Sequence, residues 1–193
     1  AGTGMDAFTH NIECYLSNVF NPPADSIALD GLEKAWAYVE RATRDGQDRE
    51  ARYNMAVAAM EGAMVFQKGL GAVHALSHPT GGLKGYRTHH GTLNAVYLPA
   101  VLRFNAPAVG DKYARVAQVM GLPKRERNAE GVANAVAELN ARLGIPKGLS
   151  GMGLKQEVVE AIADGALGDH CHLTTPRQPT KAEYVQLIQE SWG

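Results

Sequence analysis

Apolar residues recur every three to four positions along most of the chain, the spacing that places them on one face of an α-helix. Residues 5–17 show this clearly, with Phe8, Ile12 and Leu16 one turn apart. No segment alternates apolar and polar residues between hairpin turns, as a half-buried strand would. The pattern predicts helices over residues 5–17, 24–43, 48–70, a short segment holding 74–78, 92–105, 109–120, 129–143, 155–163 and from about 180. We therefore expect an all-α helical bundle.

Local signals set the expected ends of these helices. Pro79 should discourage further helix after residue 78, and Pro99 should kink the apolar helix of residues 92–105. The sequence from Thr180 to Glu183 has the form of a capping box at the start of the last helix. The segment 48–70 is rich in alanine and methionine, so we expect it to be a central buried helix.

Composition places the chain among ordinary globular proteins. Its 193 residues suit one domain over residues 1–193, and 45% are hydrophobic and 20% charged. A formal net charge of -1 gives no reason to expect nucleic acid or an anionic membrane as partner. No run approaches the roughly 20 apolar residues that span a bilayer, and no secretory leader is recognisable.

Cys14 and Cys171 are the only cysteines, too few for a disulfide scaffold, which favours a reducing compartment such as the cytoplasm. The chain opens without methionine and enters helical periodicity almost at once. This start is typical of the middle of a longer polypeptide.

Residues 69–91 carry the main chemical signal, because four of the seven histidines fall there. His74 and His78 are one helical turn apart, so their rings share a face. Asp6 and His10 have the same spacing, and His89-His90 follows a glycine-rich loop. Two helical pairs and a loop histidine can close a nitrogen and oxygen cage for Fe²⁺, Zn²⁺, Co²⁺ or Ni²⁺.

Two familiar motifs are ruled out by their context. Ala75 stands where an H-E-x-x-H metalloprotease needs its glutamate, which excludes peptide hydrolysis by that route. Residues 2–7 match a dinucleotide fingerprint on paper, but no strand precedes them and Asp6 would sit beside the phosphates.

We interpret two other groups of polar residues as structural. The run from Asp169 to His172 is a second potential metal cluster, but adjacent residues rarely converge on one ion, so we interpret it as structural. Glu13 and Cys14 could support the cage from outside, although we expect them to face neighbouring helices.

Several stretches, taken together, resemble the iron-containing (group III) alcohol dehydrogenases, specifically their dehydroquinate synthase-like C-terminal helical domain. The matching residues are 3–13, 69–82, 90–95, 99–105 and 175–177. The resemblance implies that Asp6, His10, His74 and His90 hold the metal, Fe²⁺ in the first place and Zn²⁺ as the alternative. It implies that His78 is not a ligand but a catalytic residue for proton relay. This chain has His89 where the family usually has proline, and Gly91 favours His90 as the ligand.

The implied reaction is reversible, NAD(P)-linked oxidation of a small alcohol to an aldehyde or ketone. The family's N-terminal Rossmann-like NAD(P)-binding domain is absent from this sequence, so we expect the chain alone to bind metal but to be inactive. A homo-oligomer is possible by the same resemblance. Lys84 and Arg87 could favour an acidic substrate, although solvated loop charges are the simpler interpretation.

Two other classes of function stay open from the sequence. One is a metal-binding helical module without catalysis. The other, a metal-dependent hydrolase of the helical histidine/aspartate type, would need an adjacent His-Asp dipeptide that the sequence lacks.

Overall fold

Helices and short 3-10 turns make up the regular structure of the computed structural model, which describes residues 1–193 and has no strand. The predicted all-α class is confirmed. The α-helices are α1 Gly2–Leu16, α2 Pro22–Arg44, α3 Arg49–Met64, α4 Ala72–Gly81, α5 His90–Val109, α6 Lys112–Val119, α7 Ala129–Arg142, α8 Val159–Gly168 and α9 Lys181–Glu190. The 3-10 helices are η1 Phe66–Lys68, η2 Lys124–Glu126, η3 Ser150–Met152, η4 Gln156–Val158 and η5 His170–Thr174.

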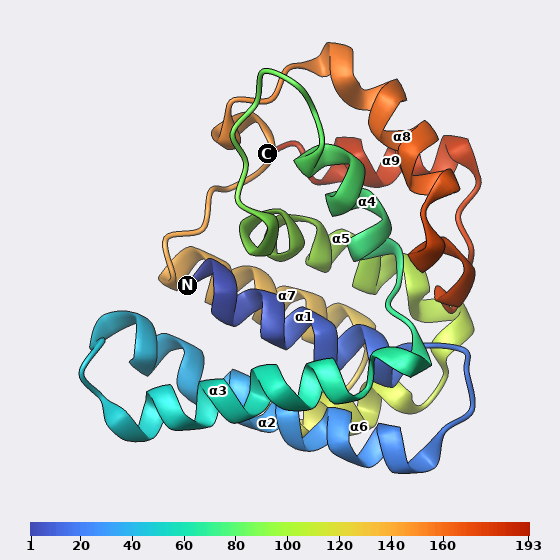
Figure 1. Cartoon of the computed structure of the whole chain (residues 1–193). Helices are drawn as coiled ribbons and strands as arrows, with labels where there is room; N and C mark the ends of the chain where they lie inside the picture. The colour runs from blue at the N-terminus through green and yellow to red at the C-terminus, as the bar shows by residue number, and fades with distance from the viewer.

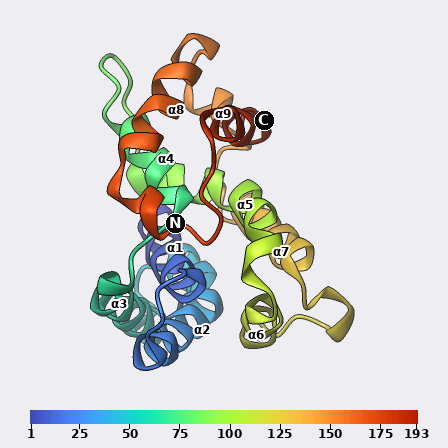
Figure 2. The same ribbon diagram turned by 90° about the vertical axis from the view of Figure 1, so that its right-hand side faces the viewer.

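The helices gather in three groups, which Figure 2 separates most clearly. Helices α1, α2 and α3 pack together, α5 packs with α6 and α7, and α8 packs with α4 on one side and α9 on the other. Helix α1 crosses the middle of the molecule, with α4 and α5 above it and α2 and α3 below it in Figure 1. Because α1 contacts α5, and α5 contacts α4, all three groups share one apolar core.

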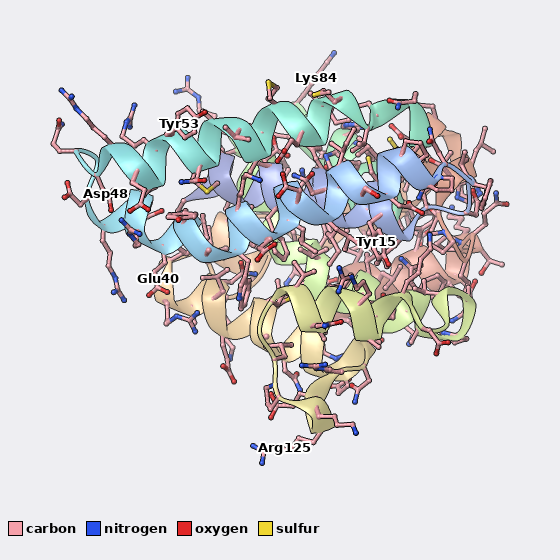
Figure 3. All side chains as sticks on the ribbon, turned by 90° about the horizontal axis from the view of Figure 1, so that it is seen from below. Tyr15, Glu40, Asp48, Tyr53, Lys84 and Arg125 are labelled. Atoms are coloured by element: carbon pink, nitrogen blue, oxygen red, sulfur yellow. The ribbon has the colours of Figure 1, made fainter.

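The expectation that residues 48–70 form a central buried helix is wrong. Helix α3 lies at the edge of the molecule, where Tyr53, Met60 and Met64 are exposed (Figure 3). Its buried positions are small ones, Ala51, Ala58 and Gly62. The small residues let α3 approach α1 closely, so its large side chains project outward.

Pro79 also behaves differently from expectation, because α4 continues through it to Gly81. The residue lies in the last turn, where its missing N–H removes only one hydrogen bond of the helix. Its ring packs against α8 at Gly165, where an added Cβ would lie 2.4 Å from the Cβ of Pro79. Tertiary packing here outweighs the local preference against helix.

The remaining predicted elements exist with shifted ends. Residues 109–120 belong to two helices, since α5 runs to Val109 and α6 begins at Lys112. The capping box at Thr180 is confirmed, with the Thr180 side chain and Glu183 each bonded to the other's backbone. No helix is long and apolar enough to span a membrane.

Candidate metal centre

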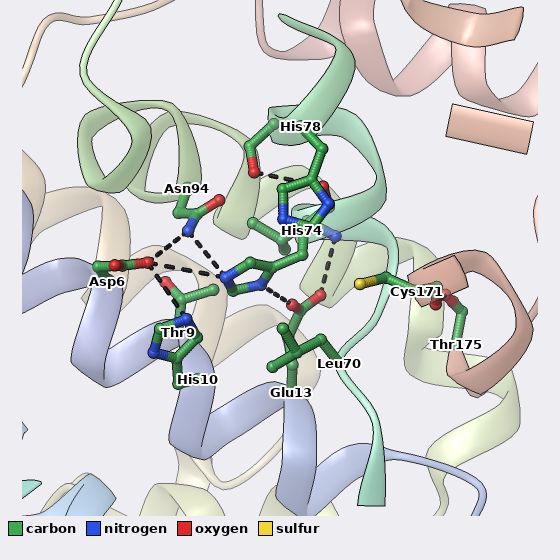
Figure 4. A network of polar contacts seen from close by, with 12 residues as sticks. Asp6, Thr9, His10, Glu13, Leu70, His74, His78, Asn94, Cys171 and Thr175 are labelled. Atoms are coloured by element: carbon green, nitrogen blue, oxygen red, sulfur yellow. Dashed lines mark hydrogen bonds and ion pairs between the residues drawn. The ribbon is translucent and has the colours of Figure 1, made fainter. Parts of the chain in front are cut away.

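Asp6 and His10 from α1, His74 from α4 and His90 at the start of α5 meet at one point (Figure 4). One ligand atom from each of the four lies within 4.8 Å of the others. Asp6 Oδ1 is 3.5 Å from His10 Nε2, 3.7 Å from His74 Nε2 and 3.5 Å from His90 Nε2. The sequence-predicted cage residues are therefore brought together by three different helices.

Glycine allows the helices to come this close. A Cβ added at Gly91 would lie 2.2 Å from the carbonyl oxygen of Gly2, so only glycine permits this contact between α5 and α1. Residues 2–7, which match a dinucleotide fingerprint in sequence only, lie inside α1 and take part in helix packing. His89 caps α5, where its Nδ1 accepts a hydrogen bond from the Thr92 N–H, and it stays outside the cage.

Glu13 reaches from α1 to the neighbouring helix α4, as expected, and supports the cage from there. Its Oε2 accepts a hydrogen bond from His74 Nδ1 at 2.6 Å, and its Oε1 accepts one from the Val73 N–H at 2.8 Å. The first turn of α4 has no side-chain cap of its own, so Glu13 caps it from another helix. The Nδ1 bond leaves His74 Nε2 directed at the cage, as metal-ligating histidines require.

Asn94 contacts three of the cage residues, and the sequence analysis missed it. Its Nδ2 donates to Asp6 Oδ1 at 2.7 Å and lies 3.1 Å from both His74 Nε2 and His90 Nε2. Its Oδ1 is buried without a hydrogen-bond partner. Asn94 lies four residues after His90, one helical turn along α5, which places the two side chains side by side, but an asparagine at this spacing is no signal by itself.

The cage offers an ionised carboxylate, Asp6, and two neutral imidazoles, His10 and His90, which suits a divalent cation. Burial opposes ionisation of Asp6, but the hydrogen bond with His74 and the nearby His10 and His90 lower its pKa to about 2. Burial, with the His74 charge, lowers the pKa of His10 to about 4, and burial also lowers that of His90.

The pKa of His74 shifts in the opposite direction, upward. Burial favours its neutral form, yet the carboxylates of Asp6 and Glu13 raise its pKa to about 9. A cation at the cage would therefore displace a proton from His74. The set of one carboxylate and three imidazoles fits a divalent transition metal.

His78 lies beside the cage without joining it. Its ring centroid is 5.7 Å from that of His74 and 5.5 Å from that of His90. Its Nδ1 donates to Asp169 Oδ2 at 2.8 Å. Asp169 is thus connected to the site, which the interpretation of residues 169–172 as purely structural did not anticipate.

A groove of about 550 Å³ opens next to Asp6 and His10, between α1, α2 and α3. Small side chains such as Ala56, Ala59 and Ala63 line it, and the ring of Phe66 lies 4.8 Å from that of His10. Asp6 and Arg52 are the charged side chains in its lining, because the lowered pKa of His10 leaves that ring neutral, and Arg52 makes no ion pair. Lys84 projects away from the molecule and Arg87 is exposed, which fits solvated loop charges (Figure 3).

Comparison with known proteins agrees with this geometry. Residues 1–192 match the sequence model described as Fe-containing alcohol dehydrogenase family, C-terminal. A 4-hydroxybutyrate dehydrogenase of Cupriavidus necator is 54% identical over 99% of this chain and 51% of its own length. An NAD-dependent methanol dehydrogenase of Bacillus methanolicus is 34% identical over 98% of this chain and 50% of its own.

The solved structure of a protein similar in sequence confirms the fold. The crystal structure of a 1,3-propanediol oxidoreductase superposes with a TM-score of 0.93 and 34% identity, over 100% of this chain and 51% of that one. The chain therefore spans about half the length of the relatives that it matches.

Proposed function

Because the chain belongs to the Fe-containing alcohol dehydrogenase family, we propose that it forms the metal-holding part of a metal-dependent alcohol dehydrogenase. The observation that carries the proposal is the convergence of Asp6, His10, His74 and His90 from three helices. We assign these four residues as ligands, with Fe²⁺ as the first choice and Zn²⁺ as the alternative. Imidazole and carboxylate accommodate both ions, so metal availability decides between them.

A divalent ion held here supplies Lewis-acid stabilisation of negative charge on an alcohol oxygen. The protein's own residues orient its ligands and handle the proton. Glu13 and Asn94 orient His74 and Asp6 through the hydrogen bonds described above. We assign His78 to proton relay, because it lies beside His90 and Asp169 holds its Nδ1, which leaves Nε2 to receive the hydroxyl proton.

We propose that residues 1–193 are one domain and that NAD(P), as hydride acceptor, is bound by a separate domain. The half-length match supports this division, as does the absence of a strand that could start a dinucleotide-binding unit. The groove beside His10 suits the carbon chain of a small alcohol. An acidic group on that alcohol would meet Arg52, which lines the groove, whereas Lys84 and Arg87 do not line it.

The test joins this chain to the preceding half of the Cupriavidus necator relative, the most similar of those described. With Fe²⁺, we expect NAD(P) reduction that depends on 4-hydroxybutyrate or on a neutral alcohol such as 1-butanol. His90→Ala should remove bound metal and activity together, whereas His89→Ala, its matched neighbour outside the cage, should keep both. Metal bound without any alcohol-dependent turnover would favour a non-catalytic module. Metal binding that survives His90→Ala would contradict the ligand assignment.

A further inference from the structure

A second group of metal-competent side chains lies on the far side of His78 from the cage. The ligand atoms of His78, Asp169, His170 and Cys171 all lie within 4.8 Å of one another. His78 belongs to α4, whereas the other three stand at the start of η5, 91 residues later in the chain. Tertiary folding, not sequence adjacency alone, therefore assembles this set.

The side chains of the group also contact one another directly. Asp169 Oδ2 is 2.8 Å from His78 Nδ1, and Asp169 Oδ1 is 3.6 Å from His170 Nδ1. Cys171 Sγ is 3.4 Å from His170 Nε2. The rings of His78 and His170 stack at 5.8 Å between centroids. A cation between Asp169 and His78 would replace the proton that His78 Nδ1 now donates to Asp169 Oδ2.

The exposed side chains of the group give an ion a route of entry, and the buried ones hold fixed positions. The His170 side chain is 82% exposed and that of His78 is 34% exposed, whereas Asp169 is 12% exposed and Cys171 is buried. In Figure 4 the sulfur of Cys171 points toward the polar network around His74 and Glu13, away from Thr175. The Asp169 side chain is held as well, because its Oδ1 accepts a hydrogen bond from the Cys171 N–H at 2.8 Å.

We propose that His78, Asp169, His170 and Cys171 form a second metal site, selective for a thiophilic divalent ion such as Zn²⁺. One thiolate, one carboxylate and two imidazoles would balance a charge of +2, and the sulfur distinguishes this set from the sulfur-free cage at Asp6. The proposal does not depend on the dehydrogenase function. An ion here would hold His78 in place and occupy its Nδ1.

Cobalt(II) reports on the two sites separately, because only a thiolate ligand gives an intense sulfur-to-cobalt charge-transfer band in the near ultraviolet. The reduced 193-residue chain is titrated with CoCl₂ while absorbance and bound cobalt are recorded. We expect two equivalents to bind, with the band rising with one of them, and Zn²⁺ to bleach it. Cys171→Ser should abolish the band, whereas Cys14→Ser, which changes the other buried cysteine, should retain it.

His170→Asn provides a variant that should keep the fold, because the side chain is 82% exposed. It should weaken the cobalt affinity of the band-forming site at least about tenfold, in line with the loss of one metal-supporting group. Asp6→Asn, which alters only the first cage, should leave the band in place. Saturation with cobalt without the band, or a band that persists in Cys171→Ser, would overturn the second site.

Discussion

At the scale of single residues, Glu13 combines two tasks that usually fall to different side chains. One carboxylate oxygen caps the N-terminus of α4 through the Val73 N–H, and the other fixes the proton on His74 Nδ1. Gly71 makes room for it, since a Cβ there would lie 2.8 Å from Glu13 Oε1. The start of the helix and the orientation of its metal-facing histidine are thereby set by the same group.

This arrangement predicts an unusual effect of Glu13→Gln. The Val73 N–H requires an acceptor, so the amide oxygen must face it and the amide N–H₂ must face His74. His74 would then accept at Nδ1 and carry its proton on Nε2, the atom directed at the cage. We expect metal affinity to fall about 10–100-fold with the fold retained, measured by calorimetric titration with Zn²⁺.

The control for this prediction is Glu33→Gln, at an exposed position of α2 without an ion pair. It should leave affinity unchanged. Unchanged affinity in Glu13→Gln as well would show that the tautomer of His74 is not fixed by residue 13.

The four proposed ligands were expected from the resemblance to the iron-containing alcohol dehydrogenases, since an i, i+4 spacing pairs only Asp6 with His10 among them. Asn94 and the contact between His78 and Asp169 could not be found in this way. An asparagine inside an apolar helix has no distinctive spacing by itself, and the second contact joins residues 91 positions apart. Both depend on how α4, α5 and η5 pack.

At the scale of elements, the C-terminus of α1 is held by side chains from elsewhere, since its last turn contains no basic residue. Lys68, fully buried in η1, donates from Nζ to the carbonyl oxygens of Cys14 at 2.7 Å and Tyr15 at 3.1 Å, and pairs with Asp25 at 2.6 Å. Lys112 adds a bond to the Tyr15 carbonyl at 2.7 Å. These contacts neutralise the negative end of the helix dipole.

Replacing Lys68 by methionine should therefore be costly, because it leaves Asp25 and the α1 carbonyls without their partner. We expect a loss of about 3–5 kcal/mol in the free energy of unfolding by urea. Asp25→Asn in the same chain should recover part of that loss. Lys112→Met removes a half-buried side chain and should cost less; equal costs at both positions would show that burial of Lys68 is not decisive.

Between α2 and α3, Glu61 faces Asp30, and the two carboxyl groups share Lys34. Burial first, and then the neighbouring Asp30, raise the pKa of Glu61 to about 7. An unfolded glutamate titrates near pH 4.3, so the folded protein loses stability as pH rises from about 4.3 through 7. Glu61→Gln should remove this loss and melt at a higher temperature than the wild type above pH 7.

The two proteins should melt alike near pH 4, where Glu61 is protonated in both states. Glu138→Gln, at an exposed position without an ion pair, serves as control and should show no such pH-dependent difference. A wild type that gains stability from pH 5 to 7 relative to Glu61→Gln would contradict the sign of this shift.

Most helices could be predicted because their apolar periodicity is strong, yet their placement could not. The methionines of α3 suggest burial, but Gly62 determines which face turns inward, since a Cβ there would approach that of His10 to 3.0 Å. The helix also ends before residue 70, because η1 turns Lys68 toward α1 and Gly69 adopts a φ of +83°. Such contacts are tertiary and leave no local periodic signal.

At the scale of the whole molecule, the cage joins α1, which packs with α2 and α3, to α4 and α5, which belong to the other two groups of helices. A bound ion would thus link parts of the fold that otherwise meet through apolar contacts. Ferrous iron at one hundred times its dissociation constant should stabilise the chain by about 2.7 kcal/mol. For this chain length the melting temperature should rise by about 5–10 °C.

Differential scanning calorimetry under anaerobic conditions measures this shift, and a chelator should reverse it. Asp6→Asn, which keeps the shape but removes the cage's negative charge, should show little of it. An equal rise in Asp6→Asn and the wild type would mean that the ion stabilises the protein from another place.

The packing of α4 also implies an order in time. A ribosome adds about 5–20 residues per second, N-terminal residues first. All four cage residues precede residue 91, whereas α8 and η5, which pack on α4, begin at Val159 and His170. The helix bearing His74 is therefore synthesised several seconds before the elements that cover it. During that interval its histidines meet whichever metal ions the surroundings of the growing chain provide.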